Sequence, residues 1–189
     1  MEKLKILILP LGAFFLGFLV LIGSVAGIVQ MLFMTLIYLS RNHLRSAMRR
    51  IVKNNFVLVV VFGTIFGVVE EVLWFVSEPG IRQTMFGSLY VDLVSTFPAY
   101  LIFYVIIYIF ARHCKTTGEK AFLYGGIFGY FFYFIAESGL FGFHFGGVPG
   151  APVWLILIWE INNFFLNGLL VWFPLYLSDL YVERSQPYE

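Results

Sequence analysis

Long apolar runs separated by short polar segments dominate the hydrophobic pattern of this chain. The runs cover residues 6–40, 56–76, 86–111, 121–143 and 152–178. A helix that crosses the hydrocarbon core of a bilayer, ~30 Å thick, needs about 20 predominantly apolar residues, and each of the last four runs fits one such helix. The pattern therefore predicts an all-α fold. We expect a polytopic transmembrane helix bundle of about five spans, with residues 1–189 forming a single transmembrane domain.

The first run is too long for one span. At 1.5 Å per residue, a helix over residues 6–40 would be roughly 50 Å long, which exceeds the thickness of the hydrocarbon core. Either one helix leaves the membrane and continues along its surface, or the run bends near Gly23-Ser24-Val25-Ala26-Gly27. If it bends into a hairpin, the bundle has six spans and both termini lie on the same side.

Basic residues gather in two of the connections between runs. These residues are Arg41, Arg45, Arg49, Arg50 and Lys53 in segment 41–55, and Arg112, Lys115 and Lys120 in segment 112–120. Cytoplasmic loops of membrane proteins carry an excess of Lys and Arg, so we expect a cell-membrane protein with both segments in the cytoplasm. Apolar residues at helical spacing within segment 41–55 further predict an interfacial helix that contacts phospholipid head groups.

Composition supports a membrane protein and excludes several other classes. The chain is 60% hydrophobic and 12% charged, whereas soluble domains carry about 25% charged residues. The single cysteine, Cys114, excludes an intramolecular disulfide and a cysteine-based metal cage. No basic domain is present, so no nucleic acid partner is expected. Membrane lipids are the expected partners, and an oligomer or a larger complex stays open.

Five carboxylates lie inside the apolar runs, which contain no Lys or Arg. They are Glu70, Glu71, Asp92, Glu137 and Glu160. A charge at the bilayer centre costs at least ~2.5–3.5 kcal/mol, so we expect these acids to converge, carry protons, bind a cation or face water. Helical rise places all five within roughly 10–12 Å of the outer surface. The sequence therefore predicts one polar cavity in the outer half of the membrane.

Other polar residues belong to the same layer. His144 follows Glu137 by seven residues, and Glu160, Asn163 and Asn167 form one stripe along their run. Simpler interpretations exist for some of them. Asp92 lies near the start of its run, where we expect a solvated residue, and asparagines often join neighbouring helices by hydrogen bonds. Glu70 and Glu71 are adjacent, so we expect only one of them to point into the bundle.

Small residues one helical turn apart recur in three runs. The pairs are Gly23/Gly27, Gly63/Gly67 and Gly125/Gly129. Such pairs let helices approach closely in lipid, so they predict a compact bundle. Pro98 and Pro174 lie inside runs and are expected to kink their helices.

The first functional hypothesis is an intramembrane hydrolase. Two neighbouring carboxylates in a low dielectric do not both ionise cheaply, which leaves one acid and one base to activate water. A nearby histidine or asparagine would stabilise the developing oxyanion. The candidate catalytic residues are Glu70, Glu71, Glu137 and His144, and the candidate substrate- or ion-binding residues are Asp92, Glu160, Asn163 and Asn167.

A family resemblance agrees with this hypothesis. Glu70-Glu71 inside an apolar helix resembles the opening motif of the intramembrane glutamate protease superfamily, which includes CAAX-protease and bacteriocin-processing enzymes and PrsW-type proteases. Tyr124-Gly125-x-x-x-Gly129 leading to Glu137 is similar to the second PrsW-type motif. The family's histidine motif reads Leu140-x-x-x-His144 here, and its late His-x-x-x-Asn motif is missing. The resemblance implies hydrolysis of a membrane-embedded peptide or lipid substrate, with no cofactor required.

Three alternatives remain open. The carboxylates could bind a divalent metal or pass protons or cations, with Glu70, Glu137, His144 and Glu160 as the ligands. A protonated glutamate could instead act on an isoprenoid or carotenoid lipid, with aromatic side chains stabilising a carbocation. Finally, the chain could be an accessory subunit of a membrane complex, whose acids pair with basic residues of a partner.

Overall fold

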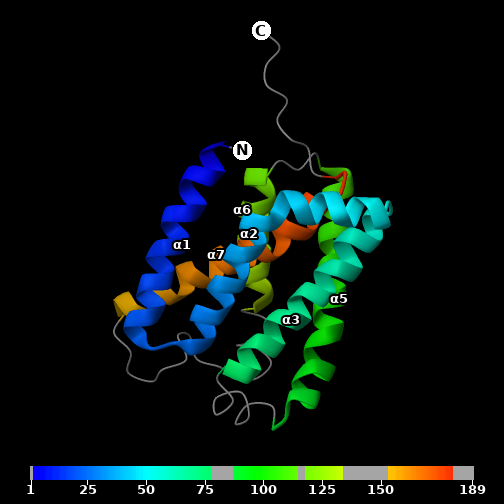
Figure 1. The fold of residues 1–189 in the computed structure, drawn as a ribbon. Helices are drawn as coiled ribbons and strands as arrows, with labels where there is room; N and C mark the ends of the chain where they lie inside the picture. The colour runs from blue at the N-terminus through cyan, green and yellow to red at the C-terminus, as the bar shows by residue number, and fades with distance from the viewer. Residues whose placement is uncertain (1, 78–86, 115–117, 134–152, 181–189) are drawn as a thin grey trace.

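The computed structural model describes residues 2–77, 87–114, 118–133 and 153–180, and within these ranges every regular element is a helix (Figure 1). The elements are α1 (Glu2–Ile22), α2 (Val25–Ile51), the π-helix η1 (Val57–Val61), α3 (Phe62–Ser77), α5 (Leu89–His113), α6 (Gly118–Tyr133) and α7 (Val153–Leu177). The predicted all-α fold is confirmed. The length of the apolar runs carries this part of the prediction, because each is long enough for a membrane-spanning helix and much longer than a strand.

The first apolar run bends where its glycines and serine predict. Gly23 adopts φ +70°, a backbone conformation that glycine reaches at no steric cost. The Ser24 side chain then caps α2 by accepting a hydrogen bond from the backbone N–H of Gly27 at 3.2 Å. The run is therefore two helices, α1 and α2, which contact one another. The alternative of one long helix is wrong.

Helix α2 continues through the basic segment without a break. Figure 1 shows its second half crossing the end of the bundle at which α5 ends and α6 begins. This half is attached to the end of α7, because Arg49 pairs with Asp179 and the Tyr176 hydroxyl donates to the Asn42 side chain at 2.5 Å. The predicted helix over the basic segment is confirmed as the second half of α2, which ends at Ile51. Its contact with phospholipid head groups stays a prediction.

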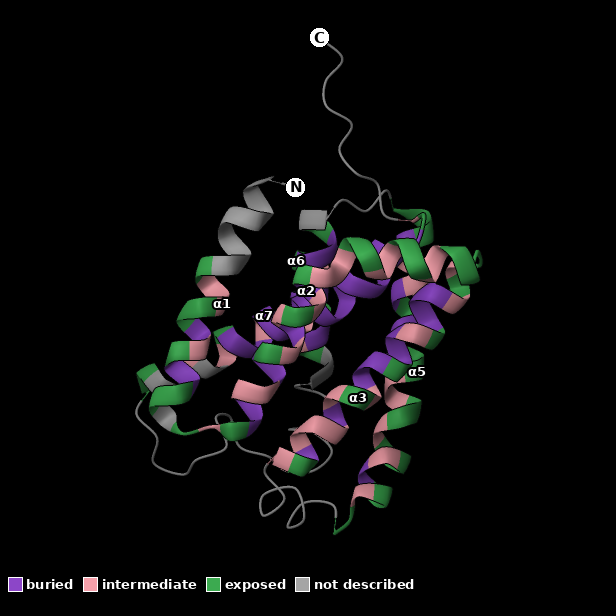
Figure 2. Ribbon diagram, viewed as in Figure 1, coloured by how far each residue is buried: buried purple, intermediate pink, exposed green. Residues whose placement is uncertain are grey.

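Helix α7 is the centre of the packing. It contacts α2, α3, α5, α6 and η1, and Figure 2 shows buried segments concentrated along it and on the facing sides of α2 and α3. The outer face of α5 instead exposes apolar side chains, among them Ile102, Ile106 and Ile109. An exposed apolar stripe of this kind suits contact with lipid.

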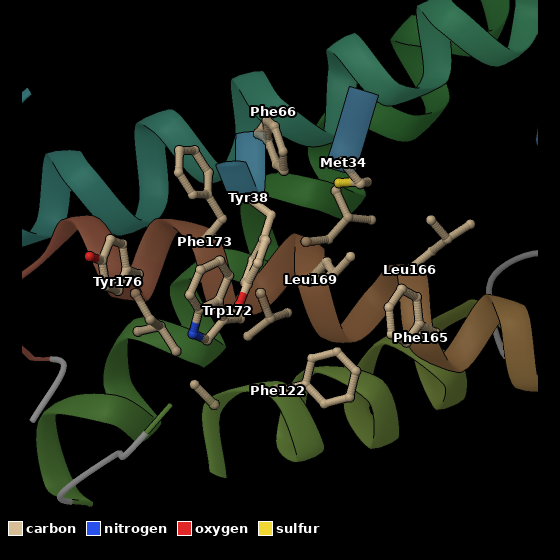
Figure 3. Close-up of a cluster of buried hydrophobic side chains, with 14 of the residues drawn as sticks. Met34, Tyr38, Phe66, Phe122, Phe165, Leu166, Leu169, Trp172, Phe173 and Tyr176 are labelled. Carbon is tan, nitrogen blue, oxygen red and sulfur yellow. The ribbon is translucent and has the colours of Figure 1, made fainter. Parts of the chain in front are cut away.

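Glycines set the close contact between α6 and α7. A Cβ added at Gly125 would lie 2.5 Å from Cβ of Val171 and 3.0 Å from the backbone oxygen of Asn167. A Cβ at Gly129 would meet Asn167 in the same way. Since neither position has room for a side chain, the predicted role of Gly125/Gly129 in helix packing is confirmed. Aromatic rings such as Phe122 and Phe165 fill the space beside this contact (Figure 3).

Three helical segments of the described chain are long and apolar enough to cross a membrane. They are Val25–Ile51, Val57–Ser77 and Leu89–His113, and the shorter apolar helix Pro10–Leu21 accompanies them. The second segment joins η1 to α3. A π-helical turn shifts the faces of the helix that follows it, so η1 contributes to setting which side of α3 turns towards α5 and α7.

Candidate functional site

The best-defined polar cluster joins Glu70 and Glu71 of α3 to Tyr100 of α5 and Gln30 of α2. The Tyr100 hydroxyl lies 3.1 Å from Oε2 of Glu70 and 3.0 Å from Oε1 of Glu71. Both glutamates therefore contact the same group, and the expectation that only one points into the bundle is wrong. Because the Tyr100 hydroxyl of the facing helix α5 lies between the two carboxylates, the adjacent residues Glu70 and Glu71 of α3 both reach it.

Glycines of α3 place the tyrosines of α5. A Cβ at Gly67 would lie closer than 3.0 Å to the ring of Tyr100, and a Cβ at Gly63 would lie equally close to the ring of Tyr104. The pair Gly63/Gly67 thus receives two aromatic rings, whereas the sequence predicted only that helices approach there. The Tyr104 hydroxyl donates to the backbone oxygen of Leu170 at 3.0 Å. Tyr100, one turn earlier, reaches the carboxylates.

Gln30 completes the cluster from α2. Its side chain is 0% exposed, and its amide nitrogen donates to Oε1 of Glu70. Its amide oxygen has no hydrogen-bond partner among the described residues. Sequence analysis missed this residue and Tyr100. The available signal for Gln30 is that it is the only side-chain amide in the apolar run 6–40.

Asp92 is buried and does not face solvent. It lies in the first turn of α5 and is 0% exposed, so its interpretation as a solvated surface residue is wrong. It precedes Tyr100 by eight residues, which corresponds to about 12 Å along the helix. Asp92 is therefore a buried acid separate from the α3 pair, placed on α5 more than two turns from the hydroxyl that bridges the glutamates.

Glu160, Asn163 and Asn167 lie along α7 as the sequence predicts. Glu160 is half-buried, and its carboxyl interacts electrostatically with the hydroxyl of Tyr130 on α6. Asn167 donates to the backbone oxygen of Asn163 at 2.9 Å within its own helix, and it fills the space beside Gly129. Asn167 therefore acts in packing. Glu160 and Tyr130 thus bring a carboxyl and a hydroxyl near one another between α7 and α6.

Two predicted catalytic residues, Glu137 and His144, lie outside the described residues. The convergence of all five acids in one cavity therefore stays a prediction. The same holds for the metal site, since Glu137 and His144 belong to its proposed ligands. Within the described ranges, no group of three or more His, Cys, Asp or Glu side chains could hold a metal ion.

The observed cluster supplies donors and acceptors for proton transfer. A tyrosine hydroxyl has one proton and also accepts hydrogen bonds, so a two-centre hydrogen bond to each glutamate requires one carboxyl to be protonated. In that protonation state, the Tyr100 hydroxyl lies between one carboxylic acid and one carboxylate. Comparison of the chain with protein-family models, with curated proteins and with solved structures found no match.

Proposed function

We propose that this chain is an integral membrane hydrolase of the glutamate type, in which Glu70 and Glu71 activate water for attack on a peptide or lipid substrate in the membrane. The single observation that carries the proposal is the Tyr100 hydroxyl between the two carboxylates. The resemblance of Glu70-Glu71 to the opening motif of intramembrane glutamate proteases supports the same conclusion.

The two glutamates have different surroundings, and the proposed roles follow from them. Glu70 accepts hydrogen bonds from Gln30 and Tyr100, which suits the carboxylate that removes a proton from water. Glu71 is only 4% exposed, which suits the neutral acid. The water oxygen adds to the carbonyl carbon, the carbon–nitrogen bond of a peptide breaks, and the acid gives its proton to the leaving amine.

The test uses three membrane samples, from cells that produce the unaltered chain, the Glu70→Gln variant or the Glu71→Gln variant. Mass spectrometry of peptide N-termini identifies the cleavages that depend on the protein. We expect new termini within or beside apolar segments for the unaltered chain and a loss of at least about 100-fold for either variant, the usual contribution of general acid–base catalysis. New termini at equal abundance in all three membranes would contradict the proposal.

Proton or cation transfer is the second candidate. The favouring observation is again the carboxylate–hydroxyl–carboxylate arrangement, because acids in membrane spans also relay protons. Purified protein in vesicles that enclose a pH-sensitive dye separates the two functions. Proton flux that Glu70→Gln abolishes, without any protein-dependent cleavage, would replace the hydrolase with a proton pathway.

We propose six membrane spans, formed by α1, α2, η1 with α3, α5, α6 and α7. Support comes from the bend at Gly23 and from the three helical segments of sufficient length. The basic second half of α2 and the residues at the end of α5 lie at the same end of the bundle (Figure 1). The excess of positive charge there favours a cytoplasmic location for that end.

A further inference from the structure

An apolar pocket of about 200 Å³ lies between α1, α2 and α7. Its lining is Gly12, Ala13 and Leu16 from α1, Met31, Met34, Thr35 and Tyr38 from α2, and Phe165 and Leu169 from α7. The lining residues of α7 and most of those of α2 are buried, whereas Ala13 on α1 is exposed. The pocket is therefore closed towards the centre of the bundle and reaches the surface beside α1. Figure 3 shows Met34, Tyr38, Phe165 and Leu169 in the surrounding core.

The size and lining of the pocket suit a hydrocarbon chain. An apolar cavity of roughly 150 Å³ is large enough for benzene, so this pocket has room for a segment of an acyl chain. The Thr35 hydroxyl is already used, because it donates to the backbone oxygen of Met31 at 2.7 Å. A side opening beside α1 suits a chain that enters from the bilayer.

Positive charge lies at one end of the pocket. The guanidinium carbon of Arg41 is 4.2 Å from the ring centroid of Tyr38, and one of its nitrogens donates to the Tyr38 backbone oxygen at 2.6 Å. Arginine has five N–H donors, so this bond leaves others for a ligand. Tyr38 also packs against Trp172, whose ring stacks on that of Tyr176, and Arg45 lies over Tyr176. At this end of the pocket, the rings of Tyr38, Trp172 and Tyr176 pack against one another. Arg41 and Arg45 lie over two of these rings.

We propose that this pocket binds one acyl chain of an anionic phospholipid whose phosphate and head group are held at Arg41. An apolar pocket alone would accept the chain of any lipid. Arg41 adds a preference for a net negative head group, since the choline ammonium of a zwitterionic lipid offsets the charge of the phosphate that the guanidinium binds. This lipid site is separate from the carboxylate pair, and its lining includes neither Glu70 nor Glu71.

The test measures lipid binding to the purified protein by native mass spectrometry. The probes are dioleoylphosphatidylglycerol, which is anionic, and dioleoylphosphatidylcholine, which is zwitterionic. We expect a Kd roughly fivefold lower for the anionic lipid, the contribution of one arginine near an anionic head group. Arg41→Gln should remove this preference. Arg50→Gln, an exposed position of the same helix, should retain it.

A second pair of variants tests the pocket itself. A Cβ at Gly12 meets nothing within 4 Å, so Gly12→Leu fills the pocket without a clash at its Cβ. It should weaken binding of both lipids by about tenfold, the loss expected when two chain methylenes are excluded. Gly17→Leu adds the same side chain at another open position of α1 that lies outside the lining, and it should leave binding unchanged.

Two results would overturn the proposal. One is equal affinity of the unaltered protein for the two lipids, which needs no variant and so does not depend on the folding of any. The other is equal lipid binding by Gly12→Leu and Gly17→Leu. Either result would mean that the pocket is an unfilled space in the packing of the bundle and not a binding site for an anionic lipid.

Discussion

At the scale of single residues, the carboxylate pair depends on Tyr100. Its hydroxyl is 3.1 Å from Glu70 and 3.0 Å from Glu71, whereas Tyr104, one turn along the same face of α5, donates to a backbone oxygen of α7. The two tyrosines are packed alike against glycines of α3. They therefore form a matched pair in which only one hydroxyl touches the proposed catalytic groups.

The first prediction compares Tyr100→Phe with Tyr104→Phe. Each change removes one hydroxyl and should destabilise the fold by about 1 kcal/mol. Only Tyr100→Phe should lower protein-dependent cleavage, by roughly 100-fold, because it breaks the link between the two carboxyls. Thermal unfolding and the N-terminus assay measure the two effects. Equal cleavage by the two variants would remove Tyr100 from the mechanism.

The carboxylates themselves could be predicted from the sequence, but their partners could not. Five acids in apolar runs without a compensating Lys or Arg are visible as a count. Which side chain meets Glu70 depends on how α2 and α5 are rotated about their axes, and that rotation is set by contacts such as the ring of Tyr100 on Gly67. Gln30 and Tyr100 therefore emerged only from the packing.

At the scale of elements, glycines decide how the helices meet. The rings of two tyrosines of α5 pack directly on Gly63 and Gly67, and α7 packs directly on Gly125 and Gly129. Gly23 forms the turn between α1 and α2. The sequence predicted the helices and the bend because the length of an apolar run and a glycine- and serine-containing interruption within it are local features of the chain. It treated the three glycine pairs as equivalent, since spacing alone does not say whether a ring or a backbone will fill the space.

The second prediction concerns Gly67→Ala and Gly63→Ala. Both place a Cβ within 3.0 Å of a tyrosine ring, so each should cost about 1–3 kcal/mol of stability through overpacking. Gly67→Ala displaces Tyr100 and should also lower cleavage, whereas Gly63→Ala displaces Tyr104 and should spare it. Unfolding curves and the cleavage assay are compared for both. If Gly63→Ala lowers cleavage as much, the effect is one of stability alone.

The third prediction tests the turn between α1 and α2. Gly23→Ala forces an L side chain into φ +70° and should lower the free energy of unfolding by about 1–2 kcal/mol. Gly17→Ala is the control, because Gly17 lies inside α1 with open space around it. That change should stabilise the helix by roughly 0.5–1 kcal/mol. If Gly23→Ala changed the free energy of unfolding in the same way as Gly17→Ala does, the result would contradict the described bend.

At the scale of the whole molecule, the excess of positive charge at one end of the bundle favours the proposed orientation in the membrane. The turn between α1 and α2 lies at the opposite end of the bundle from the basic half of α2 (Figure 1). The exposed Cys114, the only cysteine of the chain, follows α5 at the basic end. Hydropathy alone left the first run, 6–40, as either one helix or a hairpin. The backbone at Gly23 shows that it bends, and the number of membrane spans stays a prediction.

The fourth prediction uses Cys114 to determine the orientation. A membrane-impermeant maleimide should label Cys114 only after intact cells are permeabilised, because the basic end is proposed to be cytoplasmic. The control is the double variant Cys114→Ser with Ser88→Cys, which moves the thiol to the exposed residue before α5. This variant should be labelled in intact cells. The reverse pattern would invert the topology.

The most direct test of the carboxylate pair as a hydrolytic site is the incorporation of oxygen from labelled water. Purified protein in lipid vesicles, supplied with extracted membrane proteins in ¹⁸O-water, should generate new peptide C-termini that carry the label, because the attacking oxygen comes from water. Glu70→Gln and Glu71→Gln should yield none of these labelled ends, and Tyr104→Phe should yield them as the unaltered protein does. Labelled ends of equal abundance in the glutamine variants would show that the pair does not activate water.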